Sequence, residues 1–206
     1  QDTWHAHGEP LGDEEVRLTK RALGWPEDRT FYVPDAALRQ FRECVERGAE
    51  LQARWRQRVD AYSVAYPDRG REFERMVAGA LPDDWASRLP MFTPASGETA
   101  TRDAGGLVMN ALTEVLPNLV GGSADLDPST RTGLKGCGDF ESPRMQPHEA
   151  RPTQGTVGGV WSYAGRNIHF GLREHAMAAI MTGMACHGGV IPFGATFLSF
   201  SDYMRP

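Results

Sequence analysis

Glycine is concentrated in one part of this 206-residue chain: fourteen of its 23 glycines fall between residues 121 and 194. Several follow directly after a short apolar run, as in NLVGG, NIHFG and VIPFG. Short apolar runs that end at glycine are typical of buried strands that turn sharply. Because apolar helical segments separate these runs, the region after about residue 95 is predicted to be α/β, with a doubly wound parallel sheet.

Ligands of such sheets bind beyond the carboxyl ends of the strands. Three polar stretches, GGSAD, GLREH and GATF, each follow a predicted strand in this region. We therefore expect these three segments, which are distant in sequence, to meet at one site.

The chain before residue 95 has a different pattern. Between Pro34 and Tyr66 it contains no proline and only one glycine, Gly48, and apolar residues recur mostly at steps of three or four. This spacing predicts one long amphipathic helix. Shorter helices are predicted in GDEEVRLTKRALG and GREFERMVAGAL, and a long loop is predicted over residues 127–164. A loop of that length is usually functional.

Composition and charge argue against several classes of function. The net charge is −5 with no block of like charge, so neither nucleic acid nor an anionic membrane surface is a favoured partner. No apolar run approaches the roughly 20 residues of a membrane span, and the first residues do not resemble a signal peptide. The chain lacks an initiator Met, which suggests an internal fragment. Three scattered cysteines, Cys44, Cys137 and Cys186, predict a reducing, cytoplasmic compartment.

Glu174 and His175 stand at the start of a predicted apolar helix. The order is wrong for a zinc protease, which needs His-Glu-x-x-His, because Ala179 stands four residues after His175. Two interpretations stay open for Glu174. It complements the positive end of the helix, or it faces an apolar pocket and takes part in proton transfer.

Two further motifs also allow two interpretations each. In GGSADLDPS the glycines, with Ser123 or Ser129, could cradle a phosphate, or the stretch could be a plain turn. In TFLSFSDY, Phe197, Phe200 and Tyr203 would share one face of a helix, as a core stripe or as a wall around a flat heterocycle.

Taken together, the motifs resemble those of transketolases. They are, in order, AHGEPLGDEEV, TATR, GGSADLDPS, GRNIHFGLREHAMAAI and PFGATFLSFSDY, and their order and spacing match the family along the whole chain. The resemblance covers about a third of a typical transketolase. It implies the end of the diphosphate-binding domain at residues 1–33, a helical linker at 34–95 and the first part of the pyrimidine-binding domain at 96–206.

The resemblance implies a thiamine diphosphate enzyme that moves a two-carbon ketol unit between sugar phosphates such as xylulose 5-phosphate and ribose 5-phosphate. The family uses a divalent cation, Mg²⁺ or Ca²⁺, and works as a homodimer with the active site between subunits. The metal ligands are expected outside this segment, in the remainder of the polypeptide, so none of the residues here is assigned to the metal.

The same resemblance implies the site residues. Glu174 would hydrogen-bond the aminopyrimidine ring and promote formation of the ylid that attacks the ketose. Asp125 and Leu126 would contact the cofactor, and the three aromatic residues Phe197, Phe200 and Tyr203 would surround its pyrimidine. His7 would lie near the diphosphate and the reacting centre and contact substrate. Arg102 and Ser129 would hold the substrate phosphate, for which a guanidinium offers a forked set of donors.

Two positions depart from the expected pattern: His169 stands where many relatives are expected to have arginine, and Glu9 replaces a common alanine. Dihydroxyacetone synthase or another thiamine-dependent sibling remains an alternative, as does a non-catalytic regulatory module that kept the scaffold.

Overall fold

The computed structural model describes residues 4–145 and 161–205. The chain divides into two compact units, residues 1–61 and residues 62–206, and each is considered by itself. Within the described residues, no helix combines the length and the apolar character needed to cross a membrane.

The first unit contains the short helix α1 (His5–Gly8), the helix α2 (Asp13–Ala22) and most of the long helix α3 (Asp35–Ala65). The charged residues of α2 favour a helix with these two ends. Its first turn carries three acidic residues and its last turn carries Lys20 and Arg21, an arrangement that complements the partial charges at the two helix ends.

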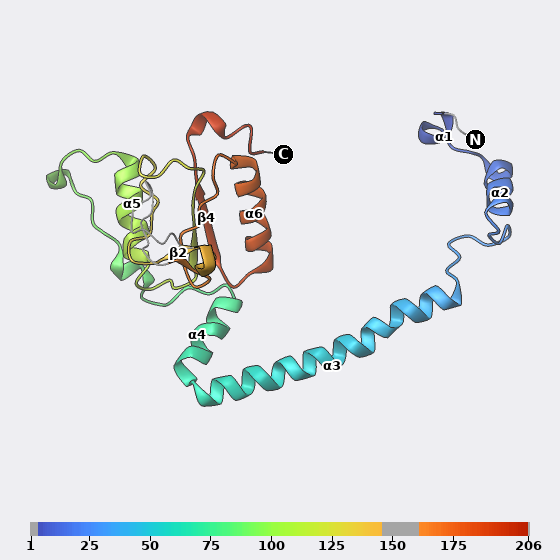
Figure 1. Cartoon of the computed structure of the whole chain (residues 1–206), viewed down its shortest axis with the longest axis horizontal. Helices are drawn as coiled ribbons and strands as arrows, with labels where there is room; N and C mark the ends of the chain where they lie inside the picture. The colour runs from blue at the N-terminus through green and yellow to red at the C-terminus, as the bar shows by residue number, and fades with distance from the viewer. Residues whose placement is uncertain (1–3, 146–160, 206) are drawn as a thin grey trace. The chain divides into compact units, whose positions relative to one another are not determined.

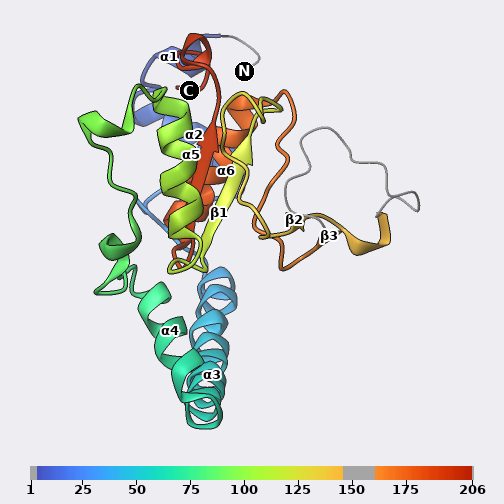
Figure 2. The same ribbon diagram turned by 90° about the vertical axis from the view of Figure 1, so that its left-hand side faces the viewer.

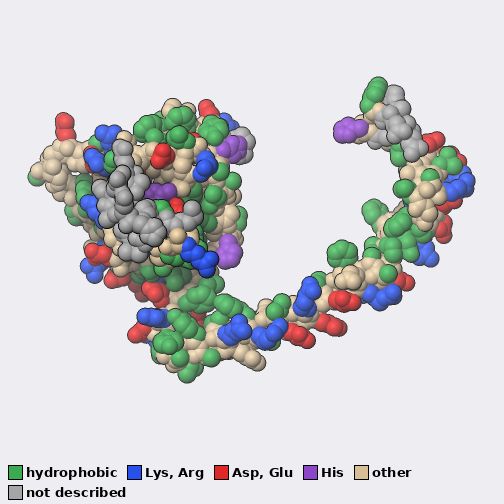
Figure 3. Space-filling view, in the orientation of Figure 1, with side chains coloured by type: hydrophobic (Ala, Val, Ile, Leu, Met, Phe, Trp, Pro, Cys, Tyr) green, Lys and Arg blue, Asp and Glu red, His purple; other side chains and the backbone are tan. Residues whose placement is uncertain are grey.

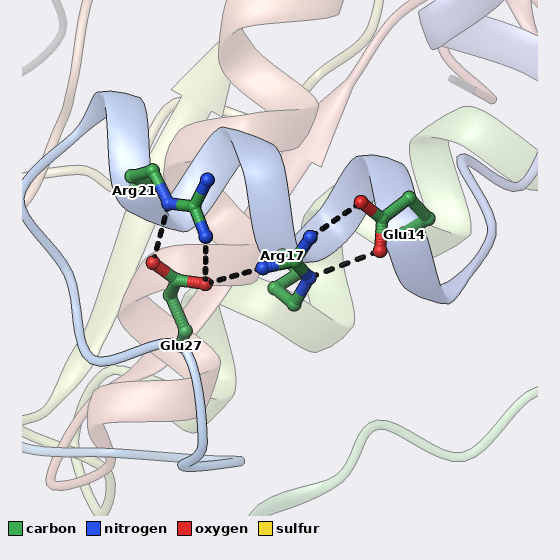
Figure 4. A network of polar contacts seen from close by, with 4 residues as sticks. All are labelled: Glu14, Arg17, Arg21 and Glu27. Carbon is green, nitrogen blue, oxygen red and sulfur yellow. Dashed lines mark hydrogen bonds and ion pairs between the residues drawn. The ribbon is translucent and has the colours of Figure 1, made fainter.

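A network of charged side chains fastens the loop after α2 to that helix (Figure 4). Glu27 accepts hydrogen bonds from Arg21 Nε and Arg21 Nη2, at 2.7 and 3.0 Å, and from Arg17 Nη1 at 3.0 Å. Arg17 also donates to Glu14, one turn earlier on α2. The hydrogen bonds to these carboxylates raise the pKa of Arg17 and of Arg21 above the ordinary value.

The hydrogen bond from Arg21 holds the pKa of Glu27 below its ordinary value, with the charges of both arginines acting in the same direction. The contribution of Glu27 to stability is therefore present above the ordinary carboxyl pKa and is lost as the pH falls through the lowered one. We expect an NMR titration of the Glu27 carboxyl carbon to show this lowered pKa, and Arg21→Ala to raise it. Arg39→Ala, which removes an arginine on α3, is the control. An unchanged Glu27 pKa in Arg21→Ala would contradict this account.

The long helix predicted between Pro34 and Tyr66 is confirmed as α3, which continues without interruption through Gly48. None of its residues is buried. In Figure 3 its hydrophobic side chains lie on the surface, interleaved with those of Arg, Asp and Glu. The exposed apolar residues of this helix include Phe41, Val45, Leu51, Trp55 and Tyr62.

The second unit begins with the end of α3. The helix α4 (Pro67–Val77) and two short 3-10 helices, η1 (Trp85–Arg88) and η2 (Pro94–Ser96), lead to the helix α5 (Thr101–Leu112). Pro67 occupies the first position of α4, where a missing N–H costs no helical hydrogen bond. Gly70 is buried against Ser63 of α3, so the two helices approach closely at this corner.

All strand pairs described in the second unit are parallel, as predicted. The strand β1 (Leu119–Ser123) pairs with β4 (Ile191–Ala195), and β2 (Asp139–Phe140) pairs with β3 (Trp161–Ser162). Asn167 connects the two pairs, because it bridges Gly121 on one side and Asp139 on the other. The resulting order is β4–β1–Asn167–β2–β3, with the carboxyl ends at one edge.

Helices cover both faces of this sheet (Figures 1 and 2), as expected of a doubly wound fold. On one face, α5 packs through Met109 and Leu112 against a core that contains Leu116, Leu119 and Leu134. On the other face, α6 (Glu174–His187) contributes Met177 and Met181 to a second core with Ala124 and Phe170. The side chains of Met177 and Met181 lie directly over Gly194 of β4, where the missing side chain makes room for them.

Three local predictions need correction. The stretch NIHFGL forms no strand and has bridges at Asn167 alone, because the chain turns away toward α6 at Gly171, whose φ is 67°. The helix predicted in FLSFSDYM is only the 3-10 helix η4 (Leu198–Phe200), followed by a turn. The predicted loop 127–164 includes β2, β3 and the 3-10 helix η3 (Pro143–Met145), while its residues 146–160 lie outside the described residues.

Candidate functional site

Three segments meet at the carboxyl edge of the sheet, as the strand-end motifs predict. The first follows β1, the second leads into α6, and the third follows β4. The amide of Ala124 donates to the carbonyl of Ala195, which joins the ends of β1 and β4. Ala124, Phe170 and Met177 then share one buried cluster, with Met204 packed against it. The edge is therefore one packed surface.

Glu174 is the first residue of α6 and lies in this packed surface with only 7% of its area exposed. Its carboxylate accepts a hydrogen bond from Thr196 Oγ1 at 3.4 Å, across from the end of β4. The position satisfies both interpretations of Glu174, because a carboxylate in the first turn complements the helix and a buried carboxylate with a single weak hydrogen bond retains acceptor capacity.

The aromatic residues Phe197, Phe200 and Tyr203 follow Thr196 and are 46%, 39% and 49% exposed. A core stripe would be buried, so these exposures argue against that interpretation within the described chain. Tyr203 makes an edge-to-face contact with His175, with ring centroids 5.5 Å apart. The aromatic segment thus lies beside the first turn of α6, next to Glu174.

The stretch GGSADLDPS forms a self-contained turn. Ser123 Oγ accepts hydrogen bonds from the amides of Leu126 and Asp127, at 3.1 and 2.9 Å. The Oδ1 atom of Asp127 accepts from the amides of Thr132 and Gly133. These amides are therefore occupied, and the plain-turn interpretation is favoured over a phosphate cradle made of the same groups.

The same turn presents Asp125 to solvent, with a φ of 61° that is uncommon outside glycine and asparagine-like residues. Asp125 lines a cavity of about 40 Å³ together with Ser123, His169 and Gly171. Leu126 beside it is partly buried. The structure thus brings Asp125 to the edge that carries Glu174.

Arg102 and Ser129 are both exposed, Arg102 in the first turn of α5 and Ser129 in the loop after β1. The neighbouring ion pair between Asp103 Oδ1 and Arg131 Nε, at 2.9 Å, ties that first turn to that loop. A cavity of about 460 Å³ lies between the two segments and is lined by Asp103, Leu107, Asn110, Asp127, Arg131 and Lys135.

His7 is exposed on α1 in the first unit, whereas Glu174 belongs to the second. No single unit therefore brings these two residues together. Among the described residues, no group of three or more His, Cys, Asp or Glu side chains is placed to hold a metal ion.

Thr196 and Asn167 belong to the site region, although neither is among the residues expected from the sequence to act there. Thr196 directly follows a predicted strand, and this position in the sequence indicates that it lies at the site. Asn167 is buried, and its side chain accepts from the amide of Leu134 at 2.7 Å and donates to the carbonyls of Leu134 and Gly138. A polar residue inside a predicted strand indicates such a bonded amide, because an unbonded one would be costly.

Comparison with known proteins shows the class of protein to which this chain belongs: it carries thiamine-diphosphate-binding domains. A family model described as "Transketolase, pyrimidine binding domain" matches residues 97–206, and one described as "Transketolase, thiamine diphosphate binding domain" matches residues 1–82. The pyrimidine-binding match covers α5, α6, the described strands and the edge of the sheet that carries Glu174. The chain belongs to the transketolase family.

The relatives agree with this assignment. The transketolase of Nostoc sp. is 44% identical over 205 residues, and that of Mycobacterium tuberculosis is 42% identical over 205 residues. Each alignment spans nearly all of this chain and 28% of the relative. A crystal structure of a Pichia stipitis transketolase variant in complex with xylulose 5-phosphate superimposes with a TM-score of 0.78 at 35% identity, covering 95% of this chain and 27% of that one.

The chain therefore spans little more than a quarter of the length of the relatives it matches. The two alternatives, dihydroxyacetone synthase or another sibling and a non-catalytic module, are not favoured, since these two relatives and the superimposed structure are all transketolases.

Proposed function

We propose that this chain is the part of a transketolase that holds the pyrimidine end of thiamine diphosphate, in an enzyme that moves a two-carbon ketol unit from a ketose phosphate to an aldose phosphate. The observation that carries the proposal is the buried carboxylate of Glu174 beside three half-exposed aromatic residues at the carboxyl edge of a parallel sheet. Sheets of this kind bind their ligands at that edge.

The side chains at this edge fit an aminopyrimidine ring. A flat heterocycle with polar ring atoms needs an apolar aromatic surface and a few well-placed polar groups. Phe197, Phe200 and Tyr203 supply the surface, and Glu174 supplies an acceptor with spare capacity. The chemistry that thiamine diphosphate supplies when bound is the stabilisation of negative charge at the carbon that is being transferred.

Each residue then has a defined task. Glu174 holds a proton shared with a nitrogen of the pyrimidine ring, and Thr196 fixes the carboxylate in place through its hydroxyl. Asp125 and Leu126 contact the cofactor from the turn after β1. Arg102 and Ser129 bind the substrate phosphate, and His7 contacts the substrate near the diphosphate.

The remaining features of the complete enzyme are also proposals. We infer a homodimer whose active site lies between subunits, with Mg²⁺ or Ca²⁺ held by residues of the polypeptide outside this segment, in the cytoplasm. Residues 1–33 would end the diphosphate-binding domain, residues 34–95 would form the helical linker, and residues 96–206 would begin the pyrimidine-binding domain. Sugar phosphates of the xylulose 5-phosphate and ribose 5-phosphate class would be the substrates, in line with the sugar phosphate complexes of the Pichia stipitis transketolase.

We expect the 206-residue chain alone to show no ketol transfer from xylulose 5-phosphate to ribose 5-phosphate, because the metal ligands and the rest of the diphosphate site are expected elsewhere in the polypeptide. The measurement is product formation with thiamine diphosphate and Mg²⁺ added to the purified chain, beside a complete transketolase as the positive control. Turnover by the chain alone would contradict the proposed division of the site.

A further inference from the structure

Asp139 is a fully buried carboxylate on β2, with 0% of its area exposed. Neither of its carboxylate oxygens accepts a well-aligned hydrogen bond in the described part of the chain. The ionisable side chain that contacts it there is His169, whose Nε2 lies 3.1 Å from Oδ1. A buried carboxylate without donors is strongly unfavourable unless a positive group accompanies it, so the imidazole is the group that can compensate Asp139.

His169 lies on the segment that delivers Glu174 to the site. Several contacts anchor the start and middle of this segment: the buried amide of Asn167, the amide of Ile168, which donates to the carbonyl of Gly121 at 2.8 Å, and the buried ring of Phe170. Gly171 then turns the chain, with a φ of 67°, and α6 begins at Glu174. The contact between His169 and Asp139 joins this segment to β2 through two side chains.

His169 also borders the site itself. Its side chain is 41% exposed, and it lines the cavity of about 40 Å³ that Asp125 and Gly171 also line. The ring therefore has one nitrogen directed at the buried carboxylate and an exposed face toward the edge where the three segments meet.

We propose that Asp139 and His169 form a positioning pair that holds the segment before α6 against the sheet and thereby sets the place of Glu174. The inference rests on the proposed function only in assigning a role to Glu174. Neither member is a catalytic residue, because the pair acts through the backbone that carries Glu174.

The groups around His169 are mainly acidic. Asp139 faces it from β2, and Asp125 and Asp127 line the same cavity from the turn after β1. Arg173 is the nearby cation on its own segment, and its guanidinium donates to the carbonyl of Phe170 at 3.2 Å. Removing the His169 imidazole therefore leaves the buried carboxylate of Asp139 without its contact and the segment before α6 without one of its anchors.

Hydrogen exchange of the amides of residues 170–174 in the purified chain tests the pair directly. After correction for intrinsic exchange at one fixed pH, we expect protection in His169→Gln to be about tenfold lower than in the wild type, because the buried carboxylate of Asp139 then loses the imidazole beside it. His169→Arg keeps a nitrogen-bearing positive group at this position, so its protection should stay near that of the wild type.

His187→Gln is the matched control, because it removes an imidazole from the other end of α6, where the His187 ring contacts the carbonyl of Gly188. This variant should keep the wild-type protection. If the wild type and His169→Gln show the same protection, or if His169→Arg loses protection as His169→Gln does, the positioning pair is wrong. Asp139→Asn provides a second variant, with the same loss expected from the other partner.

The complete enzyme gives a readout that separates this inference from the proposed function. His169→Gln should raise the thiamine diphosphate concentration needed for half-saturation several-fold and change the maximal rate little, whereas His169→Arg should restore the affinity. Retained turnover in Glu174→Gln would overturn the proposed function and leave the exchange result standing. An unchanged half-saturation and unchanged exchange in His169→Gln would overturn the pair and leave the role of Glu174 standing.

Discussion

Glu174→Gln is expected to lower ketol transfer by the complete enzyme at least about 100-fold, the range in which a positioned acid or base contributes to a rate. The substitution keeps the shape of the side chain and its hydrogen bond with Thr196, so the chain should fold as before. What it removes is the carboxylate that we propose exchanges a proton with the pyrimidine ring. The rate should be measured at saturating thiamine diphosphate and sugar phosphates, to separate turnover from binding.

Glu114→Gln is the matched control. Glu114 is an exposed carboxylate of the same unit, paired with Arg88 at 3.5 Å, and it lies outside the site. Its rate should equal that of the wild type. Thermal unfolding of both variants shows whether a lost rate reflects lost structure. A Glu174→Gln enzyme that folds and keeps its rate would favour the interpretation that Glu174 only complements the end of α6.

The parts of the fold that sequence patterns predict well are those whose apolar periodicity is strong. The long helix α3, the strands β1 and β4 and the helix α6 are predictable because each contains a clear run at helical or strand spacing. The stretch around Asn167 has the same composition, which predicts a strand. It forms bridges at Asn167 alone, since Gly171 redirects the chain toward α6, and such a turn depends on packing that a local pattern does not contain.

The candidate site, like the fold, is predictable from the sequence only in part. The convergence of GGSAD, GLREH and GATF is predictable, because the carboxyl ends of parallel strands share one edge. The contact between Glu174 and Thr196 joins residues 22 apart, and that between Asp139 and His169 joins two separate segments of the sheet. Neither follows from spacing, because the register of the sheet decides which side chains meet. The sequence leaves the role of the aromatic segment open, and its exposure in the structure is what argues against a core stripe.

Alanine at Gly121 or Gly122 is expected to destabilise the second unit by about 3 kcal/mol or more, because a side chain there has no room. A Cβ atom at Gly121 would lie 1.9 Å from the carbonyl oxygen of Phe193 on β4. At Gly122 it would lie 2.0 Å from the carbonyl oxygen of Ile168, on the other side of β1. Both obstacles are backbone atoms of neighbouring segments, which cannot move aside without separating the sheet.

Gly105→Ala is the control for these two substitutions. Gly105 lies within α5, and a Cβ atom there would meet nothing within 4 Å, so alanine should raise stability by roughly 0.5–1 kcal/mol through its higher helix propensity. Denaturant unfolding of the wild type and the three variants gives the comparison. If Gly121→Ala and Gly122→Ala unfold like Gly105→Ala, then β1 does not pack as closely against its neighbours as the structure indicates. In that case the edge that carries Asp125, Glu174 and Thr196 would lose its rigid base, since all three follow segments that pair with or flank β1.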